Sequence, residues 1–239
     1  MIELLKRVYP GTKKELYGEL YRALLREERR VIITANPEIM MLIEESDTLR
    51  NAVLNNEVIL TADGIGVIKA QKLLKLPAAS KITGIELTDF LLSACSRLHK
   101  RVFLFGAHEE VLEDLKERCK VRYPDMVLAG SANGYGEDRE AVFTRIWETD
   151  PDMVAVALGA PEQEELILAH KDEFTKGVFI GVGGTFDVLS GHKRRAPGVF
   201  RKLNLEWAYR LLREPKRLVR FCRYHIPFIL KTVKERICG

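Results

Sequence analysis

The sequence predicts an α/β fold: a Rossmann-like, mainly parallel sheet with helices on both faces, followed by a basic helical C-terminal appendage. Short runs of continuous apolar residues recur along the chain, as is typical of strands that are buried on both faces. A helical segment separates each run from the next, which favours a parallel sheet. The charge changes near the end, because 14 of the 38 Lys and Arg but only 3 of the 34 Asp and Glu fall from Gly191 onward.

The chain is long enough for one large domain with an appendage. Its 239 residues are 46% hydrophobic, which suffices to bury a full core. The composition shifts near Pro197, and no internal repeat or low-complexity linker precedes it. We therefore predict an α/β domain over residues 1–195 and a basic, amphipathic helical appendage over residues 196–239.

The first predicted element is an amphipathic helix. Thr12-Lys13-Lys14-Glu15 has the form of a capping box, and leucines at four-residue spacing follow it from Leu16. The apolar run 31–35 is a buried strand, and Asn36-Pro37-Glu38 after it has the cap, proline and acidic residue of a helix start.

The remaining elements alternate between strand and helix. Further strands are expected at 58–62, 102–106, 126–130, 153–159 and 178–182. Helices are expected at 67–75, 86–99, 109–123, 138–149 and 161–174. From about Pro197 the pattern is helical only, and we expect interruptions at Pro215 and Pro227.

Several classes of protein are disfavoured. The cysteines Cys95, Cys119, Cys222 and Cys238 are scattered without a CxxC pair, so they indicate reduced thiols and neither a disulfide framework nor a zinc site. The N-terminus has no signal-peptide pattern. The apolar runs fall short of the roughly 18–20 residues of a membrane span, which predicts a soluble or peripheral protein.

Polar residues and glycines gather where the predicted strands end. Thr34 and Asn36 lie at the end of the first strand, and Asp63 follows the second. Parallel strands end at one edge of a sheet, where open α/β folds bind their ligands, so we expect one site. The alternative for Asp63 is a cap of the next helix. Later strands are followed by Asn133-Gly134-Tyr135-Gly136, by 159–164 and by 181–187.

Other motifs also have structural alternatives. Gly183-Gly184 is a glycine-rich turn, which favours phosphate or sugar contact over packing alone. Gln163 in the first turn of a helix is as consistent with a ligand contact as with an ordinary polar position. Gly64-Ile65-Gly66 begins like a dinucleotide fingerprint, but Lys69 occupies the place of its third small residue.

No metal site is predicted. Asp150-Pro151-Asp152 matches the DxD form of metal-dependent sugar-nucleotide enzymes, but it precedes its strand and so belongs to the opposite edge of a parallel sheet. The lone histidines His108, His170 and His192 are typical of surface or loop positions. No cluster of His, Asp and Glu occurs elsewhere in the sequence.

The appendage carries basic residues at helical spacing. Arg210, Arg213, Arg217 and Arg220 share one helix face if Pro215 permits a continuous helix. Aliphatic and aromatic residues lie among them, which fits a helix on an anionic membrane whose arginines contact phosphates. A solvated basic helix and the arm of a homo-oligomer are the alternatives.

Taken together, these residues resemble the WecG/TagA/CpsF family of bacterial glycosyltransferases, and TagA-type members in particular, over nearly the whole chain. The resemblance implies transfer of an N-acetylmannosamine-type sugar from UDP to a lipid-diphosphate-linked N-acetylglucosamine at the cytoplasmic face of the membrane. It implies no metal and no cofactor, and an appendage that docks on the membrane and closes the site. The matching segments are 34–38, 62–66, 83–84, 158–164, 181–187, 195–197, 206–211 and 214–217.

The resemblance also implies roles for individual residues. Asp63 corresponds to the base, Thr34 and Asn36 contact the substrate beside it, and Lys81 stands where the family commonly has an arginine. The residues implied to bind the substrate are Gln163, Gly159, Tyr135, Gly183, Gly184 and Asp187.

Two other functional classes stay open from the residues alone. A nucleotide-dependent oxidoreductase would use the same kind of sheet, although the fingerprint is incomplete. A nucleic-acid-binding module would use the basic tail and bind DNA or RNA in a salt-sensitive way. The resemblance favours neither class.

Overall fold

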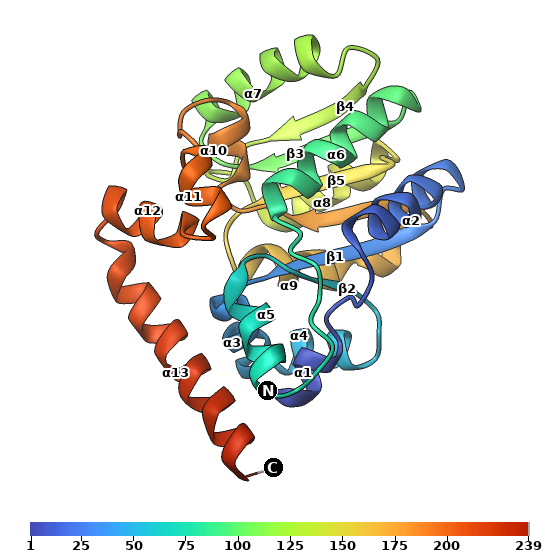
Figure 1. The fold of residues 1–239 in the computed structure, drawn as a ribbon. Helices are drawn as coiled ribbons and strands as arrows, with labels where there is room; N and C mark the ends of the chain where they lie inside the picture. Colours follow the sequence, from blue (N-terminus) through green and yellow to red (C-terminus); the bar gives the residue numbers. More distant parts are fainter. Residues whose placement is uncertain (239) are drawn as a thin grey trace.

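The computed structural model describes residues 1–238, which are built around one sheet of six strands (Figure 1). All neighbouring strands are parallel, so their carboxyl ends lie at one edge. The strand order is β2-β1-β6-β5-β3-β4. The strands are β1 Arg29–Ala35, β2 Ile59–Ala62, β3 Arg101–Gly106, β4 Val127–Ala132, β5 Met153–Ala157 and β6 Gly177–Gly181.

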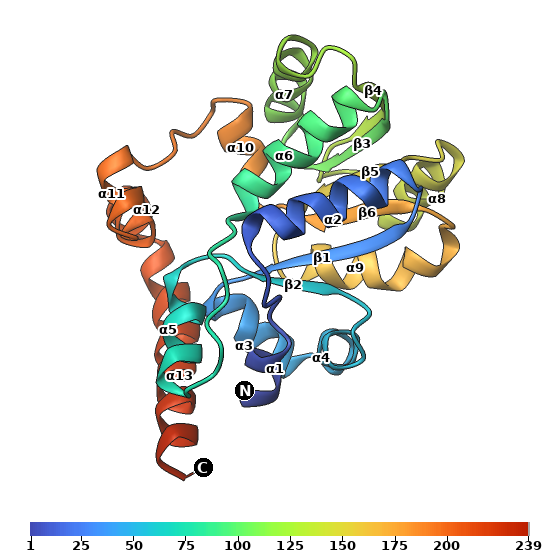
Figure 2. The same cartoon turned by 45° about the vertical axis from the view of Figure 1, so that its right-hand side comes forward.

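Helices cover both faces of the sheet, which confirms the predicted fold class (Figures 1 and 2). Successive side chains alternate between the two cores: along β6, Val178 and Ile180 pack on one side and Phe179 on the other. One layer comprises α2 Lys13–Leu25, α6 Gly84–Arg97, α7 Glu109–Arg122 and α10 Thr185–Leu189. The other comprises α1 Ile2–Lys6, α3 Pro37–Glu45, α4 Asp47–Leu54, α5 Ile65–Leu73, α8 Arg139–Glu148 and α9 Glu162–His170.

The ends of the elements differ from the predictions by a few residues, for local reasons. Thr83 Oγ1 accepts the Glu86 N–H and caps α6, so this helix begins at Gly84 and not at residue 86. β5 ends at Ala157, because Gly159 turns the chain with a φ of 88°. The helix expected to reach residue 174 ends at His170 and is followed by a 3-10 turn, Lys171–Glu173. The short helices α1 and α4 are additional to the prediction.

The appendage forms three helices, α11 Gly198–Lys202, α12 Glu206–Arg213 and α13 Arg217–Cys238. The break between α12 and α13 contains Pro215, which confirms the interruption expected there. The condition for a single stripe of four arginines is therefore not met, and the arginines lie on two helices. The interruption expected at Pro227 is wrong, because this proline lies inside α13. α13 packs beside α3 and α5 and buries Phe228 in the core (Figure 2).

Candidate active site

The candidate site lies at the carboxyl edge of four adjacent strands, β2, β1, β6 and β5. Thr34 lies in β1, and Asp63 directly follows β2. Gly183 lies in the loop after β6, and Gln163 lies in the first turn of α9, after β5. Four segments that are far apart in the sequence therefore reach one edge of the sheet, and α11 and α12 lie beyond that edge (Figure 1).

Asp63 is held by the neighbouring strand and by the start of α6. Its N–H donates to the Ala35 carbonyl at 2.8 Å, which extends the β1–β2 ladder by one residue. Its Oδ2 accepts the Gly84 N–H at 3.3 Å, at a helix N-terminus that favours negative charge. A Cβ at Gly84 would lie 3.3 Å from Thr34 Oγ1 and 3.6 Å from Asp63 Oδ2, so both side chains converge on this glycine.

Asp63 does not cap the next helix, since α5 begins after Gly64 without a side-chain cap. Burial is the main influence on its carboxyl group and raises the pKa above the ordinary value of 3.8. The charge of Arg210, the Gly84 N–H and the charge of Lys81 oppose this rise, while Glu206 adds to it. The side chain is only partly buried. A partly accessible carboxylate with a raised pKa is suited to accept a proton from a bound substrate.

Asn36 and Lys81 are engaged within the protein. Asn36 Oδ1 accepts the Ile39 N–H at 3.0 Å and caps α3. Lys81 pairs with Ala62 in an isolated bridge, which places it beside the end of β2. Its Nζ donates to Asn204 Oδ1 in the appendage at 2.9 Å. Asn36 therefore lies close to Thr34 along the chain, and Lys81 lies beside Ala62, the residue before Asp63; each also has a structural contact.

Gln163 joins two loops of the site. Its buried Oε1 accepts the Gly159 N–H at 3.1 Å and the Gly183 N–H at 3.0 Å. Both glycines have positive φ, 88° and 46°, a conformation that other residues rarely adopt. Its Nε2 donates to Glu164 Oε1 at 2.7 Å. We call this set of Gly159, Gln163, Glu164 and Gly183 the glycine clasp.

Glu164 is a residue of the site that the sequence does not single out. It is 4% exposed, and its Oε2 has no hydrogen-bond partner among the described residues. Burial raises the pKa of this carboxyl from 4.5 to about 7. An acidic residue in the first turn of a helix is usually exposed, so position alone offers no signal for this burial.

The other predicted binding residues lie around the clasp and farther along the edge. Asp187 in α10 is 3.6 Å from Lys193 Nζ, and a Cβ at Gly184 would lie 3.5 Å from its Oδ2. Tyr135, in the loop after β4, is 60% exposed and stacks on His108 with a centroid distance of 4.2 Å. The edge thus ends in a flat aromatic face that is open to solvent.

The two arginines of α12 have different surroundings. Arg210 Nη2 lies 2.9 Å from Glu206 Oε1, and its charge opposes the rise that burial causes in the pKa of Asp63. The Arg213 guanidinium lies over the ring of Tyr209, 5.9 Å from its centroid. Of the two, Arg210 is the one that acts on the Asp63 end of the site.

Arg217 and Arg220 of α13 both contact other parts of the protein. Arg217 Nε lies 2.5 Å from Glu214 Oε2. Arg220 pairs with Glu38 at the start of α3 and donates to the Ala160 carbonyl at 3.0 Å. Arg220 therefore ties α13 to the loop that carries Gly159.

The appendage also has an apolar surface. Leu212, Val219 and Ile237 are 75%, 77% and 77% exposed. No helix within residues 1–238 is both long and apolar enough to cross a membrane. The exposed large apolar side chains of the appendage are Val199, Leu203, Leu205, Trp207, Leu212, Leu218, Val219, Ile226, Ile229, Leu230, Val233 and Ile237.

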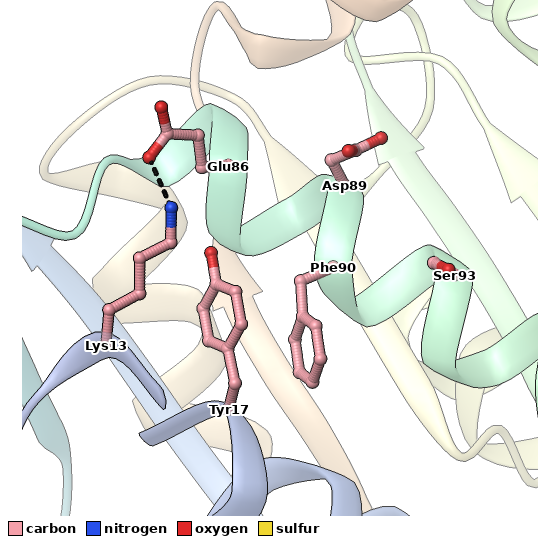
Figure 3. A pocket seen from close by; sticks show the side chains of 6 residues that line it. All are labelled: Lys13, Tyr17, Glu86, Asp89, Phe90 and Ser93. Carbon is pink, nitrogen blue, oxygen red and sulfur yellow. Dashed lines mark hydrogen bonds and ion pairs between the residues drawn. The ribbon is translucent and has the colours of Figure 1, made fainter. Parts of the chain in front are cut away.

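A cavity of about 320 Å³ lies between α2 and α6 (Figure 3). Tyr17 and Phe90 stack in it with a centroid distance of 3.9 Å. Burial acts to raise the pKa of Glu86, but Lys13 and Arg195, both at 2.8 Å, outweigh it and lower this pKa to about 2. Glu86 is already paired with Lys13 and Arg195, so we assign this cavity to the packing of α2 against α6 and not to ligand binding.

The part of the chain that the structure describes contains no group of three His, Cys, Asp or Glu that could hold a metal ion. Asp152, from the DxD motif, lies at the amino edge of the sheet, accepts the Arg101 N–H at 2.9 Å and pairs with Lys100 at 3.1 Å. This confirms that the motif lies at the edge of the sheet opposite to the candidate site. The thiols of Cys95, Cys119 and Cys222 are free, as expected, while the Cys238 side chain lies outside the described part.

Comparisons with known proteins bear on this site. A family model described as "Glycosyl transferase WecG/TagA/CpsF family" matches residues 3–239. A Staphylococcus aureus protein named N-acetylglucosaminyldiphosphoundecaprenol N-acetyl-beta-D-mannosaminyltransferase is 40% identical over 205 residues, which cover 86% of this chain and 80% of that protein. A Bacillus spizizenii protein of the same name is 41% identical over 186 residues, which cover 78% and 72% of the two chains.

Proposed function

The chain belongs to the WecG/TagA/CpsF family of glycosyltransferases, and we propose that it transfers N-acetylmannosamine, or a related sugar, from UDP to undecaprenyl-diphosphate-linked N-acetylglucosamine. The names of the two relatives support this sugar and this acceptor. The observation that carries the proposal is a partly buried Asp63 with a raised pKa, at the same sheet edge as the glycine clasp. The product would serve the synthesis of wall teichoic acid or a related cell-surface polymer.

In the proposed reaction, Asp63 is the general base of a direct displacement. The oxygen of the acceptor hydroxyl forms a bond to the anomeric carbon while the bond from that carbon to UDP breaks. The hydroxyl proton moves to Asp63, and UDP leaves with the bonding electron pair. One displacement inverts the anomeric centre. In this proposal Thr34 orients the acceptor hydroxyl, and the convergence of its Oγ1 with Asp63 on Gly84 supports this role.

The donor occupies the other half of the edge in this proposal. The glycines of the clasp let the sugar and phosphates approach the backbone closely. The exposed ring of Tyr135 offers a face on which the uracil can stack. Asp187, beside Gly184, offers a carboxylate to the hydroxyls of the nucleotide.

The departing diphosphate needs positive charge, and we propose that the protein supplies it without a metal ion. Arg210 and Lys81 already act on the Asp63 carboxyl group, so their charge reaches the reacting centre. The fork of an arginine suits phosphate oxygens. Full activity in EDTA is expected, and strict dependence on Mg²⁺ or Mn²⁺ would remove this part of the proposal.

We place the reaction at the cytoplasmic face of the cell membrane, because the proposed acceptor is a lipid. α12 and α13 combine exposed apolar side chains with arginines, as in helices that lie on anionic membranes. Arg213 and neighbouring basic residues would contact lipid phosphates. Docking would hold α12, and with it Arg210, against the site where the lipid substrate enters.

A panel of UDP-sugars, offered with a lipid-diphosphate acceptor analogue, tests the proposal. We expect UDP release and sugar transfer with N-acetylmannosamine or a close relative as the donor. Binding of NAD(P) without binding of UDP would instead favour an oxidoreductase. Salt-sensitive binding to DNA or RNA in preference to anionic liposomes would favour a nucleic-acid-binding module.

A further inference from the structure

We propose that Glu164 is a positioning residue, which fixes the orientation of the Gln163 side chain and so holds the two glycine turns of the donor site together. This inference rests on the proposed function for the location of the donor site. It assigns a role to a residue that takes no part in the proposed reaction steps. Glu164 acts through Gln163 and is not itself a catalytic residue.

The orientation of the Gln163 amide matters because its two ends have opposite hydrogen-bonding roles. Its oxygen accepts the N–H groups of both Gly159 and Gly183, at 3.1 Å and 3.0 Å. Its nitrogen donates to Glu164 Oε1 at 2.7 Å. Turning the amide over would set its NH₂ against two N–H groups and its oxygen against a carboxyl oxygen. The acceptor that Glu164 supplies therefore selects the orientation that closes the clasp.

The pair is enclosed, so no solvent molecule can readily replace Glu164. Gln163 and Glu164 are each 4% exposed. A Cβ at Gly181 would lie 2.7 Å from both Gln163 Nε2 and Glu164 Oε1, which leaves room there for glycine but not for a larger residue. Without the Glu164 oxygen, the buried Nε2 would lose its acceptor, and leaving a buried donor unpaired is costly.

The burial of Glu164 is not explained by a stabilising ion pair. Its Oε2 has no hydrogen-bond partner within residues 1–238, and the charges that act on it are those of two further acids, Glu165 and Glu38. The Glu38 carboxylate in turn pairs with Arg220 of α13. Burying a carboxyl group without a counter-ion lowers the stability of the folded protein. Such a loss of stability is typical of functional sites, where it accompanies a fixed geometry.

Four substitutions separate this role from a general effect on folding. Glu164→Leu removes the acceptor, whereas Glu164→Gln keeps an oxygen that can take the place of Oε1. The control is Glu165→Leu, which makes the same change at the next residue. The Glu165 carboxylate accepts from Oγ of Ser46, the N-cap residue of α4, at 3.0 Å. Gly181→Ala crowds the Gln163–Glu164 hydrogen bond and is used if Glu164→Leu does not fold.

Amide hydrogen exchange at Gly159 and Gly183, followed by NMR, is the first readout because it needs no substrate. We expect Glu164→Leu and Gly181→Ala to speed exchange at both glycines by about tenfold or more, as for the loss of one buried hydrogen bond. Glu164→Gln and Glu165→Leu should retain the wild-type rates. Wild-type exchange at both glycines in Glu164→Leu would overturn the inference, whatever the substrate proves to be.

Steady-state kinetics with the UDP-sugar is the second readout. Glu164→Leu should raise KM for the donor by about tenfold with a much smaller change in kcat, and Glu164→Gln should restore KM. An equal loss of kcat in Glu164→Leu and Glu165→Leu would indicate a general effect on folding and overturn the positioning role. A wild-type protein that uses no UDP-sugar would refute the proposed function, and the exchange rates would still decide the role of Glu164.

Discussion

The buried carboxyl group of Glu164 should make the stability of the protein depend on pH near neutrality. Its pKa rises from 4.5 to about 7 on folding, so the folded state holds the proton more tightly than the unfolded chain does. The stability that this group contributes is therefore fully present below pH 4.5 and is lost as the pH rises through about 7. Glu164→Gln has nearly the same shape and does not titrate.

The size of the effect follows from the pKa change. At about 1.4 kcal/mol for each pKa unit, a rise from 4.5 to about 7 corresponds to about 3 kcal/mol for a group that is 4% exposed. Most of this falls between about pH 5 and pH 8. The free energy of unfolding of Glu164→Gln, relative to that of the wild type, should therefore rise by about 2–3 kcal/mol over this range.

Urea unfolding followed by circular dichroism at several pH values measures this difference. Other groups titrate in both proteins, and their contributions cancel in the comparison. A stability difference that stays constant from about pH 5 to pH 8 would refute the reasoning, because it would mean that Glu164 titrates alike in the folded and unfolded chains.

Three further outcomes are expected. Thr34→Val should lower kcat by about tenfold, the effect of one lost hydrogen bond, and unchanged initial rates would remove Thr34 from the reaction. Leu212→Glu combined with Val219→Glu, both at exposed positions, should weaken sedimentation with anionic vesicles by about tenfold or more, and full retention would argue against docking through α12 and α13. The activity should fall as the pH drops through the pKa of Asp63, which burial raises above 3.8, and an activity that persists well below 3.8 would contradict its role as a base.

The edge strand β4 leaves Val127 and Leu128 exposed, but the other strands were open to prediction because they are buried on both faces. This burial demands continuous apolar runs, and all six runs named from the sequence are strands of one parallel sheet. The strand order was not predictable, because nothing local in the sequence indicates that β6 lies between β1 and β5. Asp63 was identifiable as a residue after a strand, but its convergence with Thr34 on Gly84 depends on how α6 packs.

The clasp and the appendage show where local patterns stop being informative. Gln163 and Glu164 look like ordinary polar residues of a first helical turn, and their burial arises only because β5 and β6 are neighbours. Pro215 ends a helix as its chemistry suggests, but Pro227 does not. Next to Pro227, Phe228 is buried in the core, and tertiary packing of this kind outweighs the local preference of a proline.

The role of Asp63 as the base is tested most directly by Asp63→Asn, which keeps an oxygen to accept the Gly84 N–H but cannot take up the proton. We predict that kcat falls by about 10²–10⁴-fold, the usual contribution of a general base, while the Kd for UDP in titration calorimetry stays close to that of the wild type. Turnover near the wild-type rate in this variant would contradict the proposed mechanism.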